Sequence, residues 1–222
     1  MIGMILAAGR GERMMPLTEN TPKPLIKVQN IALIEHAISA LKKANITDIV
    51  INISYLGEQI KSYLGNGTKF GVNISYSDES QNALETAGGI INALPLLGDK
   101  AFIVINSDVL CDYDLSALNL PTGSLAHLVL INNPAHNPKG DFTLENNQKI
   151  TLTKNKPLTF SGLGIYHPDF FKNHLNTQGK LALYPLLVDA IAGNQLSGEH
   201  YQGYWQDIGT PERLELANNP KN

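Results

Sequence analysis

The sequence predicts an α/β fold in which helices cover a mixed, mostly parallel central sheet. Short apolar segments rich in β-branched residues alternate with longer segments in which apolar residues recur every three or four positions. The first half of the chain runs strand, glycine-rich loop, helix, strand, helix, strand, which is typical of a Rossmann-like parallel sheet. A hairpin pattern in the second half predicts a small antiparallel excursion from that sheet.

Size and composition limit the class of protein. At 222 residues the chain can bury a sizeable core, and we expect one domain over residues 1–222. The net charge of −3 and the lack of a basic cluster argue against nucleic acid as a partner. A single cysteine, Cys111, excludes an internal disulfide and is expected to serve packing. Neither a signal peptide nor a membrane span is apparent, so we expect a cytoplasmic protein that acts away from membranes.

Three segments of the first half are expected to be strands because each is short, rich in β-branched residues and bounded by turn-forming residues. The two segments between them carry apolar residues at helical spacing, and Ser54 is expected to cap the second helix. The expected strands are residues 2–8, 47–53 and 72–76, and the expected helices are residues 31–44 and 54–64.

The second half is less regular. Residues 101–105 are almost entirely apolar, which suits a strand at the centre of a sheet. The hairpin is expected over residues 141–150, with a two-residue turn at Asn146-Asn147, and should cover one end of a cleft. Pro185 either kinks a helix or lies late in its N-terminal part. The other expected elements are a surface loop at 77–83, helices at 84–94, 181–191 and from 112, 168 and 211 onward, and strands at 124–132, 160–166, 196–201 and 204–205.

A glycine-rich loop follows the first strand. Gly9 and Gly11 allow a tight turn whose backbone N–H groups can face an anion, and Arg13 and Lys23 add positive charge. Together these features suit a polyphosphate. The dinucleotide fingerprint fails because Met14 stands at its third glycine, and no Gly-Lys-Ser/Thr of a Walker loop occurs. The alternative is a glycine turn with solvated charges.

The wider string resembles the signature of sugar-1-phosphate nucleotidylyltransferases. It reads LAAGRGERM at 6–14, PLT at 16–18 and PKPL at 22–25. Local matches at 84–90, 126–130, 140–142, 159–162 and 197–201 extend the resemblance over almost the whole chain. The resemblance implies a nucleotidyltransferase GT-A-like fold, Mg²⁺ as cofactor, and a reaction of UTP with a sugar 1-phosphate that yields a nucleotide sugar and pyrophosphate.

The same resemblance assigns site residues. The nucleotide would contact Ala8, Gly9, Gly11, Glu12, Arg13, Lys23 and Gly88, of which Arg13 and Lys23 would be catalytic. The sugar phosphate would contact Asn106, Asp141, Lys156, Ser161 and Gly162. Asp108 and Asp207 would hold the Mg²⁺ ion.

Asp108 also has a physical argument of its own. It follows the expected central strand, and ligands of open parallel sheets bind at the carboxyl ends of strands. An acid there is well placed to hold a metal near phosphates, although such a residue is often only a turn residue. Ser107 departs from the glycine usual in the family, and a positive φ at that position would strain serine.

Some alternatives stay open. The same chemistry with another base or sugar, as in mannose-1-phosphate guanylyltransferases or glucose-1-phosphate thymidylyltransferases, fits the same motifs. A catalytically silent nucleotide-sugar sensor is a different class, although Arg13, Lys23, Asp108 and Asp207 are all present. No hexapeptide repeats occur, so we expect no C-terminal β-helix domain and favour a monomer.

Overall fold

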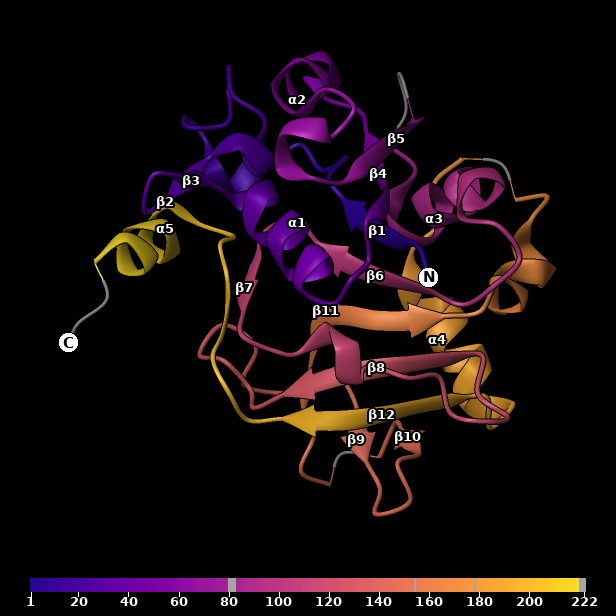
Figure 1. Ribbon diagram of the computed structural model, residues 1–222. Coiled ribbons are helices and arrows are strands. Elements are labelled where there is room, and N and C mark those ends of the chain that lie inside the picture. Colours follow the sequence, from indigo (N-terminus) through magenta and orange to yellow (C-terminus); the bar gives the residue numbers. More distant parts are fainter. Residues whose placement is uncertain (80–82, 154, 178, 220–222) are drawn as a thin grey trace.

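A central sheet of seven strands organises the protein (Figure 1). The computed structural model describes residues 1–79, 83–153, 155–177 and 179–219. From one edge to the other the strands are β12 (Leu196–Tyr201), β8 (Ala126–Ile131), β11 (Thr159–Tyr166), β6 (Phe102–Asn106), β1 (Gly3–Leu6), β4 (Asp48–Ile53) and β5 (Asn73–Asp78). Strands β6, β1, β4 and β5 are mutually parallel, β12 is parallel to β8, and β11 is antiparallel to both of its neighbours. The expected mixed, mostly parallel sheet is confirmed, with β6 at its centre.

Two hydrophobic cores lie on the two faces of this sheet. Because strand side chains alternate, Ile103 and Ile105 of β6 belong to one core, whereas Phe102 and Val104 belong to the other. The first core is completed by α1 (Leu33–Lys43) and α2 (Gly57–Leu64), and the second by α3 (Glu85–Leu97) and α4 (Leu183–Ala192). Both faces of the parallel part are therefore covered, as its continuous apolar strands require.

Smaller elements complete the fold. They are the strand pairs β2 (Lys27–Val28) with β3 (Ile31–Ala32), β9 (Thr143–Leu144) with β10 (Ile150–Thr151) and β7 (Val109–Cys111) with β13 (Trp205–Asp207), the helix α5 (Pro211–Asn218), and 3₁₀ helices at Glu12–Met14, Lys23–Leu25, Thr68–Phe70, Leu115–Ala117 and Pro168–His174. Thr210 caps α5, as expected, because its hydroxyl accepts a hydrogen bond from the Arg213 N–H. No helix within the described ranges is long and apolar enough to cross a membrane.

Two expectations for the first half were wrong in detail. Helix α2 begins at Gly57 after Leu56, whose φ is 53°, and Ser54 contributes only its carbonyl to the Gly57 N–H. Strand β5 runs on to Asp78, and Ser77 and Glu79 are buried, so the expected surface loop does not begin at residue 77. Residues 80–82 of that loop lie outside the described residues.

In the second half, the hairpin loop differs from expectation, and the structure decides between the two positions considered for Pro185. The hairpin loop has three residues, because Glu145 pairs with Lys149 and Gln148 takes the left-handed conformation typical of such loops. The hairpin itself pairs with the outer edge of β12, where the Gly198 N–H donates to the Gln148 carbonyl. Pro185 lies in the first turn of α4. Backbone N–H groups there have no acceptor within the helix, so the N–H that proline lacks costs no hydrogen bond.

A buried polar network joins β8 to β12. His127 is 3% exposed, its Nδ1 lies 2.8 Å from the Ser197 hydroxyl, and its Nε2 lies 3.7 Å from a carboxylate oxygen of Glu199. Tyr113 donates its hydroxyl hydrogen to the same carboxylate. The nearby His127 ring, and then the hydrogen bond from Tyr113, lower the pKa of Glu199 below its usual value, although burial opposes them.

We predict that Glu199 stabilises the fold in a pH-dependent way. Because its pKa is lower in the folded state, its contribution is present above the unfolded pKa of about 4.5 and is lost as the pH falls further. The urea midpoint of Glu199→Gln should lie below that of the wild type at neutral pH, and the difference should shrink below pH ~4.5. Glu215→Gln, at an exposed helical position, is the matched control. A difference that stays constant with pH would contradict the assignment.

Candidate active site

A cavity of about 240 Å³ lies at the carboxyl ends of the parallel strands. It collects residues that follow β1, β5 and β6 and one residue near the end of β4, which is where ligands of open α/β sheets bind. Five of the expected site residues line it: Ala8, Gly9, Lys23, Asn106 and Asp108. A Cβ at Gly9 would have no heavy atom within 4 Å, so this part of the loop faces open space.

The glycine-rich loop is held by backbone contacts. Gly11 has φ 67°, and its carbonyl accepts hydrogen bonds from the Met14 N–H and from the buried Thr18 hydroxyl, each at 2.8 Å. A Cβ at Gly11 would approach Lys23 Cβ to 3.0 Å, so the position needs glycine for both conformation and space. Met14 is fully buried, while Glu12 and Arg13 are exposed. The buried Met14 thus anchors the loop in the fold, and the charged side chains of Glu12 and Arg13 face solvent.

Lys23 and Asp108 form an ion pair at the edge of the cavity. Their side chains are 14% and 20% exposed, so solvent screens the pair only in part. Lys23 begins a short 3₁₀ helix between two prolines, which restrict its backbone. Asp108 follows β6, as expected from the sequence.

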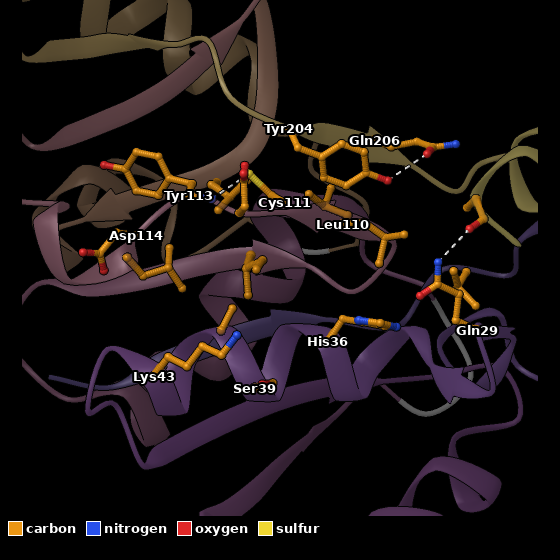
Figure 2. Close-up of a pocket in the computed structure, with 18 of the residues that line it drawn as sticks. Gln29, His36, Ser39, Lys43, Leu110, Cys111, Tyr113, Asp114, Tyr204 and Gln206 are labelled. Carbon is orange, nitrogen blue, oxygen red and sulfur yellow. Dashed lines mark hydrogen bonds between the residues drawn. The ribbon is translucent and has the colours of Figure 1, made fainter. Parts of the chain in front are cut away.

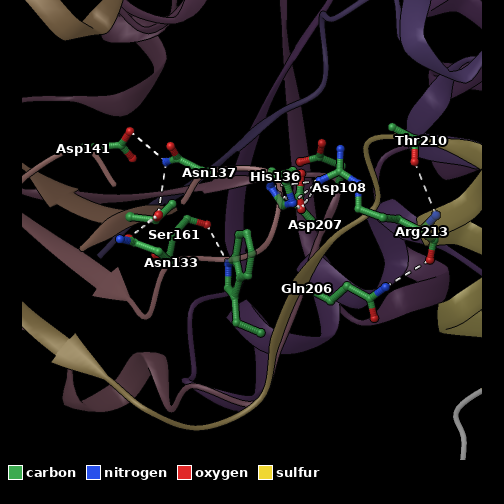
Figure 3. A network of polar contacts seen from close by, with 12 residues as sticks. Asp108, Asn133, His136, Asn137, Asp141, Ser161, Gln206, Asp207, Thr210 and Arg213 are labelled. Carbon is green, nitrogen blue, oxygen red and sulfur yellow. Dashed lines mark hydrogen bonds and ion pairs between the residues drawn. The ribbon is translucent and has the colours of Figure 1, made fainter. Parts of the chain in front are cut away.

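Asp207 lies beside Asp108 because β13 pairs with β7. Asp207 is the partner of Val109 in that register, and the Ile208 N–H donates to the Asp108 carbonyl at 2.8 Å. Arg213 forms an ion pair with the Asp207 carboxylate, and His136 Nε2 lies 3.3 Å from it (Figure 3). Each of the two acids therefore has a cationic partner of its own.

The two acids suit a hard divalent cation. Carboxylate oxygens are the ligands that such ions prefer, and Asp108 directly precedes β7 while Asp207 ends its partner strand β13. Within the described part of the chain no cluster of three or more His, Cys, Asp or Glu residues could hold a metal, so the remaining ligands would be water or phosphate oxygens. That donor set fits an ion that acts together with a phosphate substrate.

Two guanidinium groups converge near Gly209. A Cβ built there would lie 2.3 Å from Arg213 Nη2 and 3.2 Å from Arg13 Nη2. Glycine leaves the space that both arginines use. Arg13 of the N-terminal loop is thereby brought to the Asp207 side of the site.

A buried hydrogen-bond network forms the floor of the cavity. Asn52, near the end of β4, accepts from the Ala7 N–H at 2.8 Å and donates to Glu79 at 2.6 Å. The other Glu79 oxygen accepts from the Leu84 N–H at 2.9 Å. Burial raises the pKa of Glu79 despite these donors. The network ties the ends of β1, β4 and β5 to the start of α3.

The expected sugar residues divide into two groups. Asn106 and Gly162 are in contact, because a Cβ at Gly162 would lie 2.5 Å from Asn106 Nδ2, and Gly162 has φ 82°. Asp141 lies at the base of the hairpin and accepts from the Phe160 N–H at 2.8 Å and from Asn137 at 3.0 Å (Figure 3). Lys156 is exposed and lines neither this cavity nor the larger one described below.

Two residues are placed differently from expectation. The Ser161 side chain is turned into the fold, where its hydroxyl donates to the Val129 carbonyl at 2.7 Å, because a buried hydroxyl needs a partner. Gly88 lies within α3, and its N–H donates to the Leu181 carbonyl at 3.1 Å. Neither group is free for a ligand, and Gly88 does not line the cavity.

The serine that replaces the family glycine is tolerated without strain. Ser107 lines the cavity and does not have a positive φ. Its N–H donates to the Leu6 carbonyl at 3.1 Å, as in a regular continuation of the sheet. The steric cost of a positive φ at serine therefore does not apply to Ser107.

A larger cavity of about 760 Å³ lies between α1 and the β7–β13 pair (Figure 2). None of the expected site residues lines it. His36, Lys43, Tyr113 and Cys111 face it, among others. Burial raises the pKa of the Cys111 thiol to about 11, which agrees with the packing role expected for it.

Five polar residues of the site were missed in the sequence: Asn52, Glu79, Glu85, His136 and Arg213. Asn52 and Glu79 lie at the carboxyl ends of strands, so the rule that identified Asp108 could have found them. Nothing local marks His136 or Arg213, since both act through Asp207, which only the folded chain brings near.

The chain is similar to proteins of one known family. The nucleotidyl transferase family matches residues 2–221. The chain is 48% identical to an N-acetylmuramate alpha-1-phosphate uridylyltransferase from Neisseria meningitidis serogroup B, over 98% of this chain and 96% of the relative. A mannose-1-phosphate guanyltransferase from Hypocrea jecorina is 32% identical over 96% of this chain and 62% of its own length. A crystal structure assigned as a Bacillus anthracis glucose-1-phosphate thymidylyltransferase superposes with a TM-score of 0.85 at 25% identity, covering 100% of this chain and 97% of the other.

We predict that Asn52 is required for stability. Asn52→Ala would leave the Ala7 N–H and one Glu79 oxygen buried without partners, so the free energy of unfolding should fall by about 1–3 kcal/mol. Chemical denaturation measures this change. Asn73→Ala, which removes an exposed hydrogen bond to Asp48, should have a smaller effect. Equal losses in the two variants would contradict the importance of the network.

Proposed function

The chain belongs to the nucleotidyl transferase family, and from that premise we propose that it transfers the uridylyl group of UTP to N-acetylmuramate 1-phosphate. The products are UDP-N-acetylmuramate and pyrophosphate. The observation that carries the proposal is the 48% identity to the Neisseria meningitidis uridylyltransferase over nearly the whole of both chains. The guanyltransferase is less similar, and this chain spans only 62% of its length.

The site supports this reaction by its charges. Arg13, Lys23 and Arg213 supply three cations around two acids, and a triphosphate and a sugar phosphate together bring several negative charges. Lys23 would hold the α-phosphate and the attacking phosphate. Arg13 would stabilise the β- and γ-phosphates, and the Gly11 and Glu12 region of the loop would add backbone donors.

Members of this family generally use a divalent metal, and we propose Mg²⁺ held by Asp108 and Asp207. When bound, such an ion supplies a Lewis acid that neutralises phosphate oxygens. The protein's own part is to hold both carboxylates in place. Lys23 and Arg213 perform it by pairing with them.

The transfer itself needs positioning rather than covalent help. An oxygen of the sugar 1-phosphate attacks the α-phosphorus of UTP, a new O–P bond forms, and the bond to the β-phosphate oxygen breaks. The electron pair of that bond leaves with pyrophosphate. Lys23 lies beside Asp108, where the two phosphates would meet, so it offsets charge in the transition state. Asn106 and Gly162 would border the sugar.

The deciding experiment measures pyrophosphate release with Mg²⁺ over a panel of nucleoside triphosphates and sugar 1-phosphates. We expect turnover chiefly with UTP and N-acetylmuramate 1-phosphate. Turnover with another pair would keep the chemistry and replace the substrates. Binding of UTP without pyrophosphate release from any pair would overturn the enzymatic proposal in favour of a sensor.

We predict that Asp108→Asn lowers kcat by roughly a hundredfold to a thousandfold, because a neutral amide is a weaker ligand than a carboxylate for the cation that neutralises the phosphate oxygens. The amide still offers an oxygen to Lys23, so the thermal midpoint should change little. Initial-rate measurement at saturating Mg²⁺ checks the loss. Asp99→Asn, at an exposed position away from the cavity, is the matched control. Near-normal kcat in Asp108→Asn would rule out its metal role.

A further inference from the structure

Arg213 uses only part of its guanidinium group within the protein. The side chain reaches from the first turn of α5 to Asp207 and His136, and all of these contacts are made by Nη1 (Figure 3). Among the residues that the structure describes, none accepts a hydrogen bond from Nη2. The side chain is only 14% exposed. Nη2 therefore belongs to a mostly buried side chain and remains available to a ligand.

A second guanidinium group lies close to this free donor. An added Cβ at Gly209 would lie 2.3 Å from Arg213 Nη2 and 3.2 Å from Arg13 Nη2, and the sum of these distances limits the separation of the two nitrogens to about 5.5 Å. Arg13 is exposed, and no described residue forms an ion pair or hydrogen bond with its side chain. Two cations so close together repel each other. Asp207 pairs with one of them only, so the other lacks an anion.

Gly209 is suited to this arrangement by its size. Its φ does not lie in the left-handed region, so its backbone conformation does not call for glycine. A Cβ would instead overlap the Arg213 guanidinium and displace it from Arg13. The missing side chain therefore lets both arginines direct a nitrogen to the same place.

We propose that Arg213 is a further catalytic residue, whose Nη2 binds the terminal phosphates of the nucleoside triphosphate together with Arg13. One oxygen can accept hydrogen bonds of about 2.9 Å from both nitrogens at the separation given above. Pyrophosphate offers several such oxygens and carries more than one negative charge, as two guanidinium groups beside a single acid require. The inference rests on the proposed function, which supplies the triphosphate and the leaving pyrophosphate.

This position gives Arg213 two contacts at once. Nη1 holds the Asp207 carboxylate, and Nη2 binds the leaving group. When the bond from the α-phosphorus to the bridging oxygen breaks, its electron pair stays on pyrophosphate and increases the negative charge there. Arg213 offsets that charge through its hydrogen bond and transfers no proton, because a guanidinium group stays protonated.

The direct test is calorimetric binding of inorganic pyrophosphate without metal, nucleotide or sugar phosphate, at about 0.15 M salt. Arg213→Ala should raise the Kd by roughly tenfold to a hundredfold, the range of a charge-assisted hydrogen bond. Arg213→Lys, with one nitrogen to share between Asp207 and the anion, should give an intermediate Kd. An unchanged Kd in Arg213→Ala, or no measurable binding to the wild type, would overturn the proposal.

Arg10→Ala is the matched control. It removes the same charge from the glycine-rich loop, but Arg10 lies over the Tyr55 ring, at 5.1 Å from its centroid, and not beside Gly209. Because an exposed charge without direct contact is screened by salt, the Kd should stay within about twofold of the wild type. A Kd raised as much as in Arg213→Ala would overturn the assignment, since net charge alone would then explain the loss.

The absence of metal separates direct contact from an indirect role. If Arg213 acted only by holding Asp207 for a metal ion, Arg213→Ala would not change metal-free binding. Asp207→Asn removes the neighbouring negative charge and releases Arg213, so it should lower the Kd for pyrophosphate. A Kd raised in Asp207→Asn to the level of Arg213→Ala would overturn the proposal.

Failure of this proposal can be told apart from failure of the proposed reaction. Pyrophosphate binding needs no turnover, so the Kd values hold even if the substrate panel identifies another pair or none. In the reverse reaction, Arg213→Lys should raise the KM for pyrophosphate and change the KM for UDP-N-acetylmuramate little. A rise confined to the nucleotide sugar would overturn the role of Arg213. No turnover by the wild type would count against the reaction alone.

Discussion

The pairing of β13 with β7 is the contact on which the site depends. It brings Asp207, from near the end of the chain, next to Asp108, which follows the central strand. Like charges repel each other, and each carboxylate is paired with a cation from a different segment. Lys23 comes from the N-terminal loop and Arg213 from the last helix. The two ion pairs therefore connect four segments that are remote from one another in the sequence.

The remainder of the fold keeps that arrangement rigid. Strand β6 is buried on both faces, with Ile103 and Ile105 on one side and Phe102 and Val104 on the other, so the strand end that carries Asp108 has little freedom. Met14, Leu110 and Ile208 share a small third cluster, which anchors the N-terminal loop, β7 and the segment after β13 together. Apolar packing thus positions the charged groups.

The two ends of the cavity follow from the same sheet. Lys23 and Asp108 lie at the β6 end of the cavity, and Asn52 and Glu79 lie toward its β5 end. The buried Asn52–Glu79 contact, together with the Leu84 N–H, joins β4 and β5 to the start of α3 at the floor of the cavity. A charged pair therefore lies at one end of the cavity and a buried hydrogen-bond network at the other.

The sequence by itself determined the class of fold and the central strand, because periodicity is a local property that one stretch of chain displays. The family resemblance added the expectation of a phosphate loop and of two metal-binding acids. Only the tertiary structure decided which side chains are available. Ser161 and Gly88 match family motifs, yet their polar groups are used inside the fold. His136 and Arg213 carry no local mark and become part of the site through Asp207. Pairing between distant segments and the need to satisfy buried polar groups decide these points, and neither can be read from a single stretch of residues.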